Sequence, residues 1–198
     1  MRRLLMIASL LVASIAATLS SAATVPILPT GTTSVEVTAP IGALGLGATP
    51  LGTATVNTAG ANPVFDFPIT GGLVDTTAGA LIEHNGSGVE LFATASPSTT
   101  LSLENFLIDT DAGTVSGLVN GVANAVLFDF GTVDPSGIQL TISGFLAGAL
   151  TTTFGAPNLS GVEFGIANTA PETAVIPLPA GGVLLLSGLG FLALRRRA

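Results

Sequence analysis

The central part of the chain alternates apolar and polar residues with a period of two, in short segments separated by Gly, Pro, Asn and Asp. Successive side chains of a strand point to opposite faces, so this pattern predicts half-buried β-strands. A chain with about eight to ten such strands predicts an all-β fold, and we expect an antiparallel β-sandwich, with an open barrel as the alternative. The clearest strand segments are 34–38, 64–67, 89–92, 101–108, 115–119, 126–130, 138–142 and 162–167.

Three local features qualify this pattern. Residues 84–88, His-Asn-Gly-Ser-Gly, are typical of the loop of a β-hairpin. The alternation slips by one position at Asn105, which predicts a β-bulge. From about residue 143 to 154 the apolar groups follow a helical spacing, with Ser143 as an N-cap and Gly155 as the end of the helix. We therefore expect one short helix within the β-fold.

The first 23 residues have the three parts of a secretory signal peptide. Arg2 and Arg3 precede an apolar stretch over 4–19, and small residues follow as far as Ala23. Cleavage by signal peptidase is expected before Thr24. The alternative is an uncleaved membrane anchor, but an apolar helix of this length is shorter than the roughly 20 residues that span a bilayer.

The last 19 residues combine an apolar stretch, 180–194, with three arginines. Fifteen helical residues would span only about 22 Å of a hydrocarbon core about 30 Å thick. Prolines just before this stretch would interrupt a longer helix. Arg195, Arg196 and Arg197 hold this end in the cytoplasm by the positive-inside rule, which places the body outside.

A proline-containing motif precedes this C-terminal stretch, and it consists of Ile176, Pro177, Leu178, Pro179 and Ala180. Motif, apolar span and Arg cluster together resemble the PEP-CTERM class of sorting signals, in the variant whose motif is Val-Pro-Leu-Pro-Ala. Ile176 stands where that variant has Val. The resemblance implies recognition by a membrane-embedded exosortase, processing near the motif, and delivery to the cell surface or its polysaccharide matrix. A plain C-terminal membrane anchor is the alternative.

The body also resembles a poorly characterised family of bacterial exported β-domains. The similarity rests on 67–72, on the run from 79 to 86, on 105–109 and on 127–129. It implies a fold and a location, and no known reaction.

Charge is divided sharply between the ends and the body. All five basic residues are the terminal arginines, whereas the twelve acids lie between Glu36 and Glu172. The body alone therefore has a formal charge of −12, against −7 for the whole chain. Such a body repels phosphate backbones, which excludes nucleic acid as a partner. The chain has no Cys, so disulfides and cysteine metal sites are excluded too.

Few residues suggest a catalytic or metal-binding role. His84, the only histidine, is a general base, a metal ligand or, as we favour, a loop residue bonded to nearby backbone. Asp109 and Asp111 precede Gly113 and match part of a calcium loop, but the later ligands of such a loop are missing, and we favour a hairpin turn. Without Trp or Tyr the chain lacks the aromatic platforms typical of sugar-cleaving enzymes. We expect neither an enzyme nor a cofactor.

The chain is thus expected to comprise a signal peptide (1–23), a linker (24–32), a β-rich domain (33–169), a linker with the sorting motif (170–179) and an apolar C-terminal segment (180–198). We expect a non-enzymatic exported protein, tethered to the inner membrane with its body in the periplasm before processing, and then at the cell surface or extracellular. Its expected partners are signal peptidase, an exosortase-type enzyme, the membrane and extracellular polysaccharide. The alternative is a periplasmic or surface ligand-binding module held by a plain anchor, which a pocket with convergent polar groups would favour.

Overall fold

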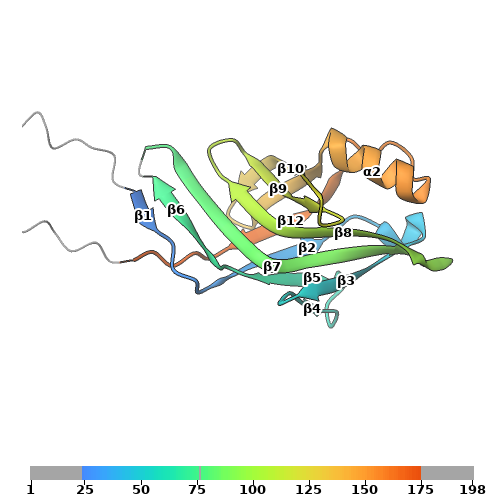
Figure 1. The fold of residues 1–198 in the computed structure, drawn as a ribbon, viewed down its shortest axis with the longest axis horizontal. Helices are drawn as coiled ribbons and strands as arrows, with labels where there is room; N and C mark the ends of the chain where they lie inside the picture. The colour runs from blue at the N-terminus through green and yellow to red at the C-terminus, as the bar shows by residue number, and fades with distance from the viewer. Residues whose placement is uncertain (1–23, 76, 175–198) are drawn as a thin grey trace, which may run out of the picture.

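The computed structural model describes residues 24–75 and 77–174, and these form strands together with one α-helix and one 3₁₀ helix (Figure 1). The predicted signal segment (1–23) and C-terminal apolar segment (180–198) lie outside the described residues. The elements are β1 (Thr24–Pro26), β2 (Thr32–Val37), η1 (Ile41–Leu44), β3 (Leu46–Gly52), β4 (Thr55–Asn57), β5 (Val64–Pro68), β6 (Gly71–Asp75), β7 (Gly79–Ala93), β8 (Ser96–Asp109), β9 (Thr114–Val119), β10 (Ala123–Asp134), β11 (Gly137–Ile142), α2 (Gly144–Phe154) and β12 (Glu163–Thr169).

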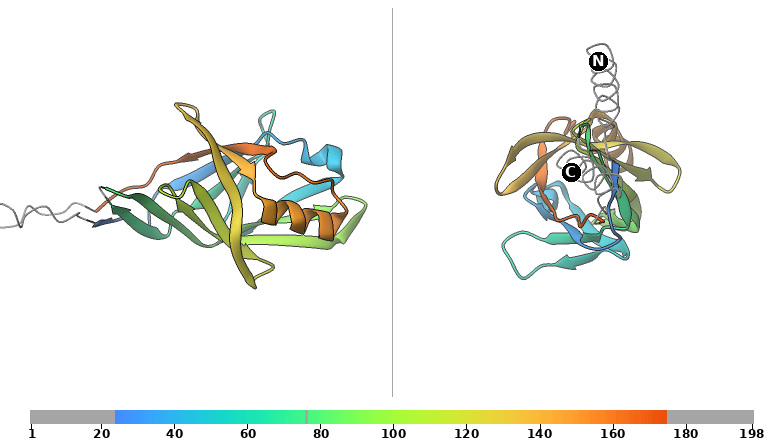
Figure 2. Two further views of the ribbon diagram at one scale, coloured as in Figure 1. Left: turned by 90° about the horizontal axis from the view of Figure 1, so that it is seen from above. Right: turned by 90° about the vertical axis from the view of Figure 1, so that its left-hand side faces the viewer.

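The strands form one continuous antiparallel sheet in the order β1-β6-β7-β8-β9-β10-β11-β12-β2-β5-β4. The first part of β7 pairs with β6, and its last part pairs with β3. The sheet curls until β5 contacts β7 and β4 contacts β3. The result is a half-barrel wrapped around the core, as the end-on view in Figure 2 shows.

The all-β, antiparallel prediction with one short helix is confirmed, but the predicted sandwich is wrong. A sandwich needs two sheets that pack face to face. Here β7, β8 and β10 are 15, 14 and 12 residues long and pass through register shifts instead of ending there. Each long strand pairs with the same neighbour on both sides of its register shift. The strands therefore form one continuous sheet and not two.

The inner face of the half-barrel is the hydrophobic core. In β2 the burial alternates residue by residue, so Val35 and Val37 are buried while Ser34 and Glu36 are only half-buried. β5 repeats the pattern with Phe65 and Phe67 buried. This is the period of two that the sequence displays, because alternate side chains of a strand face the core.

The helix α2 lies where the sequence predicts it. The Ser143 hydroxyl accepts a hydrogen bond from the Leu146 amide (3.2 Å), and Gly155 ends the helix in the left-handed conformation at φ 69°. Leu146 and Leu150 are buried, and the helix contacts β8 and β10. It closes one end of the half-barrel, together with η1 (Figure 1).

The first and last described residues meet at the opposite end. The Leu28 amide donates to the Glu172 carbonyl (2.8 Å), and the Ala174 amide donates to the Pro26 carbonyl (3.0 Å). Thr24 opens β1, which pairs with β6. Both ends of the β-domain thus leave it side by side, far from α2 (Figures 1 and 2). Within the described residues, no helix combines the length and hydropathy needed to cross a bilayer.

We expect Ser143→Ala to lower the free energy of unfolding by about 2 kcal/mol. The hydroxyl is buried, caps α2, and also donates to the Val126 carbonyl (2.6 Å). Urea unfolding measures the change, with the exposed Ser160→Ala as the matched control. Equal unfolding curves for the two variants would contradict the capping role.

Candidate functional site

The half-barrel encloses a cavity of about 50 Å³ near its centre, which we call the interior cavity. Its walls come mainly from β2, β5, β7, β8 and β12, and nearly all are apolar. Phenylalanines dominate: the Phe67 and Phe106 rings meet edge to face at 5.0 Å, and Phe128 and Phe164 lie 4.8 Å apart between ring centroids. The only polar side chains in the wall belong to Thr33 and His84.

His84 is buried in this wall, with a relative exposure of 1 %. Its Nε2 lies 2.8 Å from the Thr33 hydroxyl, which in turn donates to the Thr169 hydroxyl (2.9 Å). Which of the two groups donates in the His84–Thr33 bond is set by the tautomer of the imidazole. Nδ1, the other ring nitrogen, is buried and has no hydrogen-bond partner.

Burial lowers the pKa of His84 to about 4, and the nearby backbone of Phe106 has a smaller effect in the opposite direction. The imidazole is therefore neutral at physiological pH. His84, Thr33 and Thr169 thus form a hydrogen-bonded chain with Thr33 in the middle.

A β-bulge places His84 inside. His84 pairs with Phe106 and Gly88 pairs with Glu104, so residues 85–87 of β7 lie opposite the single residue Asn105 of β8. Asn105 adopts φ 53°, and its side-chain oxygen accepts the Gly86 amide (2.7 Å). The predicted bulge at Asn105 is confirmed.

The predicted hairpin loop at 84–88 is wrong, and with it the interpretation of His84 as a loop residue. The chain does not turn back there, because β7 runs without a break from Gly79 to Ala93. Asn-Gly-Ser-Gly favours positive φ and tight turns, which serve a hairpin and a wide bulge equally well. Burial of His84 is a consequence of this long strand, and no local signal in the sequence indicates it.

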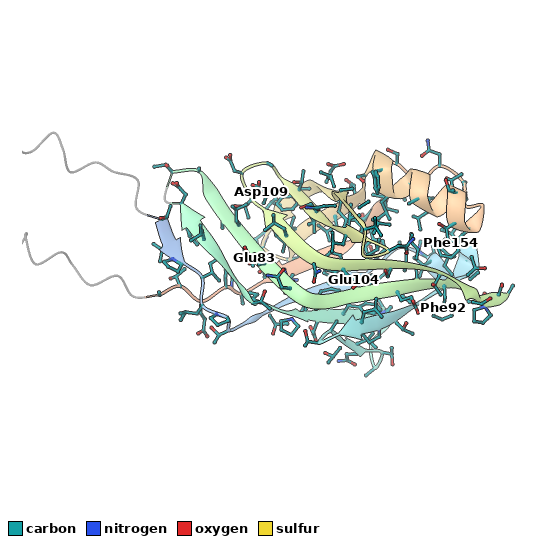
Figure 3. The ribbon with its side chains drawn as sticks, viewed as in Figure 1. Glu83, Phe92, Glu104, Asp109 and Phe154 are labelled. Atoms are coloured by element: carbon teal, nitrogen blue, oxygen red, sulfur yellow. The ribbon has the colours of Figure 1, made fainter. Side chains whose placement is uncertain are left out.

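The candidate calcium residues lie in the turn between β8 and β9. Asp109 Oδ1 accepts the amides of Asp111 (3.0 Å) and Ala112 (2.9 Å), the hydrogen bonds of an aspartate-initiated turn. Among residues 24–75 and 77–174, no three His, Cys, Asp or Glu side chains are grouped to hold a metal ion. Glu83 and Glu104 are on β7 and β8, spread away from Asp109 (Figure 3).

The residues that the sequence predicts to be processed do not line the interior cavity. The sorting motif 176–180, the arginines 195–197 and Ala23 lie outside the described residues, whereas Thr24 begins β1. Comparison with protein-family models, curated proteins and solved structures gives no match for this chain.

We expect Asn105→Ala to lower the free energy of unfolding by about 2–3 kcal/mol and Asn105→Gly by about 1 kcal/mol. Both variants lose the acceptor for the Gly86 amide, but only glycine keeps the positive φ without strain. Urea unfolding measures both, with the exposed Asn124→Ala as control. If alanine is tolerated as well as glycine, the backbone conformation does not hold the bulge.

Acid should destabilise the protein partly through His84. The folded-state pKa of about 4 lies below the ordinary histidine value of 6.5, so the unfolded chain binds this proton first, and stability falls as the pH is lowered from about 6.5 to about 4. The expected loss is about 3 kcal/mol, and His84→Leu should lack it. Urea unfolding at several pH values compares the unchanged protein with His84→Leu. Both contain the same carboxylates, so the difference between their pH profiles reports the contribution of His84. Parallel pH profiles would contradict the assignment.

Proposed function

We propose that this chain is a non-enzymatic exported protein whose acidic β-domain is displayed at the cell surface or in the extracellular matrix after sorting through its C-terminal segment. The observation that carries the proposal is the position of the domain ends. Thr24, expected to follow the signal cleavage site, opens β1, and Thr173 forms a bridge with Ile27. The Pro-Leu-Pro motif begins three residues after Ala174.

This arrangement suits removal of both terminal segments. The β-domain is closed at that end by pairing between its own terminal residues, namely 26–28 with 172–174. Cleavage before Thr24 and near Pro177 would leave these pairs in the product. The product would carry every acid and none of the arginines.

The domain accommodates its acids without any lysine or arginine between residues 24 and 174. Neutral groups provide the hydrogen bonds instead: the Asn62 amide donates to Glu36 (2.8 Å), and the Thr38 hydroxyl (2.8 Å) and Gln139 amide (2.6 Å) donate to Glu163. Hydrogen bonds from Thr77 lower the pKa of the Asp75 carboxyl, which keeps it charged. A domain whose charged residues are all acids repels other copies of itself, which supports solubility outside the cell.

Export and sorting are tested by intact-mass analysis of membrane, surface and medium fractions. We expect a product that begins at Thr24 and ends near Pro177. The double variant Pro177→Ala/Pro179→Ala should keep its C-terminal segment and accumulate in the membrane fraction. Pro171→Ala, outside the motif, is the matched control. Unchanged processing and release of the double variant would overturn the sorting proposal.

A further inference from the structure

The tip of the hairpin formed by β7 and β8 carries a run of hydroxyl side chains. Residues 94–102 have the sequence Thr-Ala-Ser-Pro-Ser-Thr-Thr-Leu-Ser, in which six of nine residues are Ser or Thr. Figure 1 shows this hairpin reaching the end of the molecule opposite to the first and last described residues. The hydroxyl-rich tip is therefore the part of these two strands that lies farthest from both ends of the β-domain.

The tip presents these hydroxyls because β8 separates from β7 there. Ala93 pairs with Ser96 and Phe92 pairs with Thr100, so residues 97–99 lie opposite no residue of β7. The first two of these three residues are exposed, and the third is half-buried. The first is a proline, which has no backbone N–H to donate and therefore suits an unpaired position. A Ser and a Thr are thus held on a segment that projects from the sheet.

The hydroxyls of the tip contribute little to the fold. The Ser98 side chain is exposed, and no hydrogen bond of its hydroxyl occurs in the described part of the chain. The hydroxyl oxygens of Ser96 and Thr99 are 3.4 Å apart, which is long for a hydrogen bond between hydroxyls. In α2, by contrast, Thr151 and Thr152 donate to carbonyl oxygens one turn earlier (2.9 and 2.8 Å). The hydroxyls of the tip are therefore the more available for modification.

The charges around the tip favour a sugar over a phosphate as the modifying group. A phosphate on Ser or Thr is stabilised where Arg or Lys side chains can bind it. No Lys or Arg occurs between residues 24 and 174, and residues 91–103 contain no charged residue at all. A phosphate would also add negative charge to a body of −12. A neutral sugar adds none, and a sequence rich in Ser, Thr and Pro is typical of O-glycosylated segments.

We propose that the tip of the β7–β8 hairpin is an O-glycosylation site, with the hydroxyl of Ser98 as the first acceptor. The donor is a sugar activated by a phosphate ester. The serine oxygen forms a bond to the anomeric carbon, the bond between that carbon and the phosphate oxygen breaks, and the phosphate leaves with the electron pair. A base of the transferase takes the hydroxyl proton. The proposal rests on the proposed export, because it requires a transferase that acts on exported proteins.

The test is peptide mapping of the protein recovered from the surface and medium fractions. Cleavage after glutamate releases residues 91–104 as one peptide, because Glu90 and Glu104 flank the tip and no acid lies between them. Mass spectrometry with electron-transfer fragmentation should show one or more hexose or N-acetylhexosamine residues on this peptide, attached to Ser98. An unmodified peptide, or one that carries phosphate, would overturn the proposal.

The same preparation distinguishes failure of this proposal from failure of the sorting proposal, since its intact mass reports the chain ends. Unprocessed ends with a glycosylated peptide 91–104 would contradict sorting alone. Processed ends with an unmodified peptide would contradict glycosylation alone.

Three variants assign the acceptor. Ser98→Ala should lose the sugar at this position, whereas Ser98→Thr should keep it, because threonine retains a hydroxyl. Thr152→Ala removes an exposed hydroxyl from α2 and is the matched control, which should be glycosylated as the unchanged protein is. All three should keep the melting temperature, since both positions are exposed. Equal glycosylation of peptide 91–104 in Ser98→Ala, or equal loss in Thr152→Ala, would overturn the assignment.

Discussion

The bulge between β7 and β8 is the constraint on which the rest of the fold depends. Three residues of β7 lie opposite Asn105, and the extra length on one strand bends the pair. Before the bend β7 pairs with β6, and after the bend it pairs with β3. The same two strands therefore serve both ends of the half-barrel, and the sheet can curl without being divided. Asn105 holds this geometry through its positive φ and its bond to Gly86.

The bulge also determines that one polar side chain, His84, faces the interior. His84 precedes it and points inward, where Thr33 and Thr169 complete a hydrogen-bonded chain. The orphaned Nδ1 and the lowered pKa follow from the same burial. Burial of one imidazole among phenylalanines costs free energy, and the cost is smaller for the neutral ring than for the charged one. His84 thus belongs to the scaffold of the cavity.

The body of the protein holds its acids without any lysine or arginine. Several of the acids accept hydrogen bonds from hydroxyls, side-chain amides and turn backbone, and no Lys or Arg occurs between residues 24 and 174. The end built by η1 and α2 holds an apolar pocket of about 140 Å³. The chain termini leave from the opposite end. A tether at the termini would accordingly leave the pocket end directed away from it.

The sequence alone predicted what local patterns govern. Alternation identified most strands, Ser143 and Gly155 delimited the helix, and the slip in phase located the bulge at Asn105. Each of these depends on residues close together in the chain. Residues 84–88 show the limit, since the same Asn and Gly residues suit a hairpin and a bulge, and only pairing with residue 105 selects between them. The tertiary structure therefore decided the half-barrel, the burial of His84 and both cavities, because each depends on contacts between strands distant in sequence.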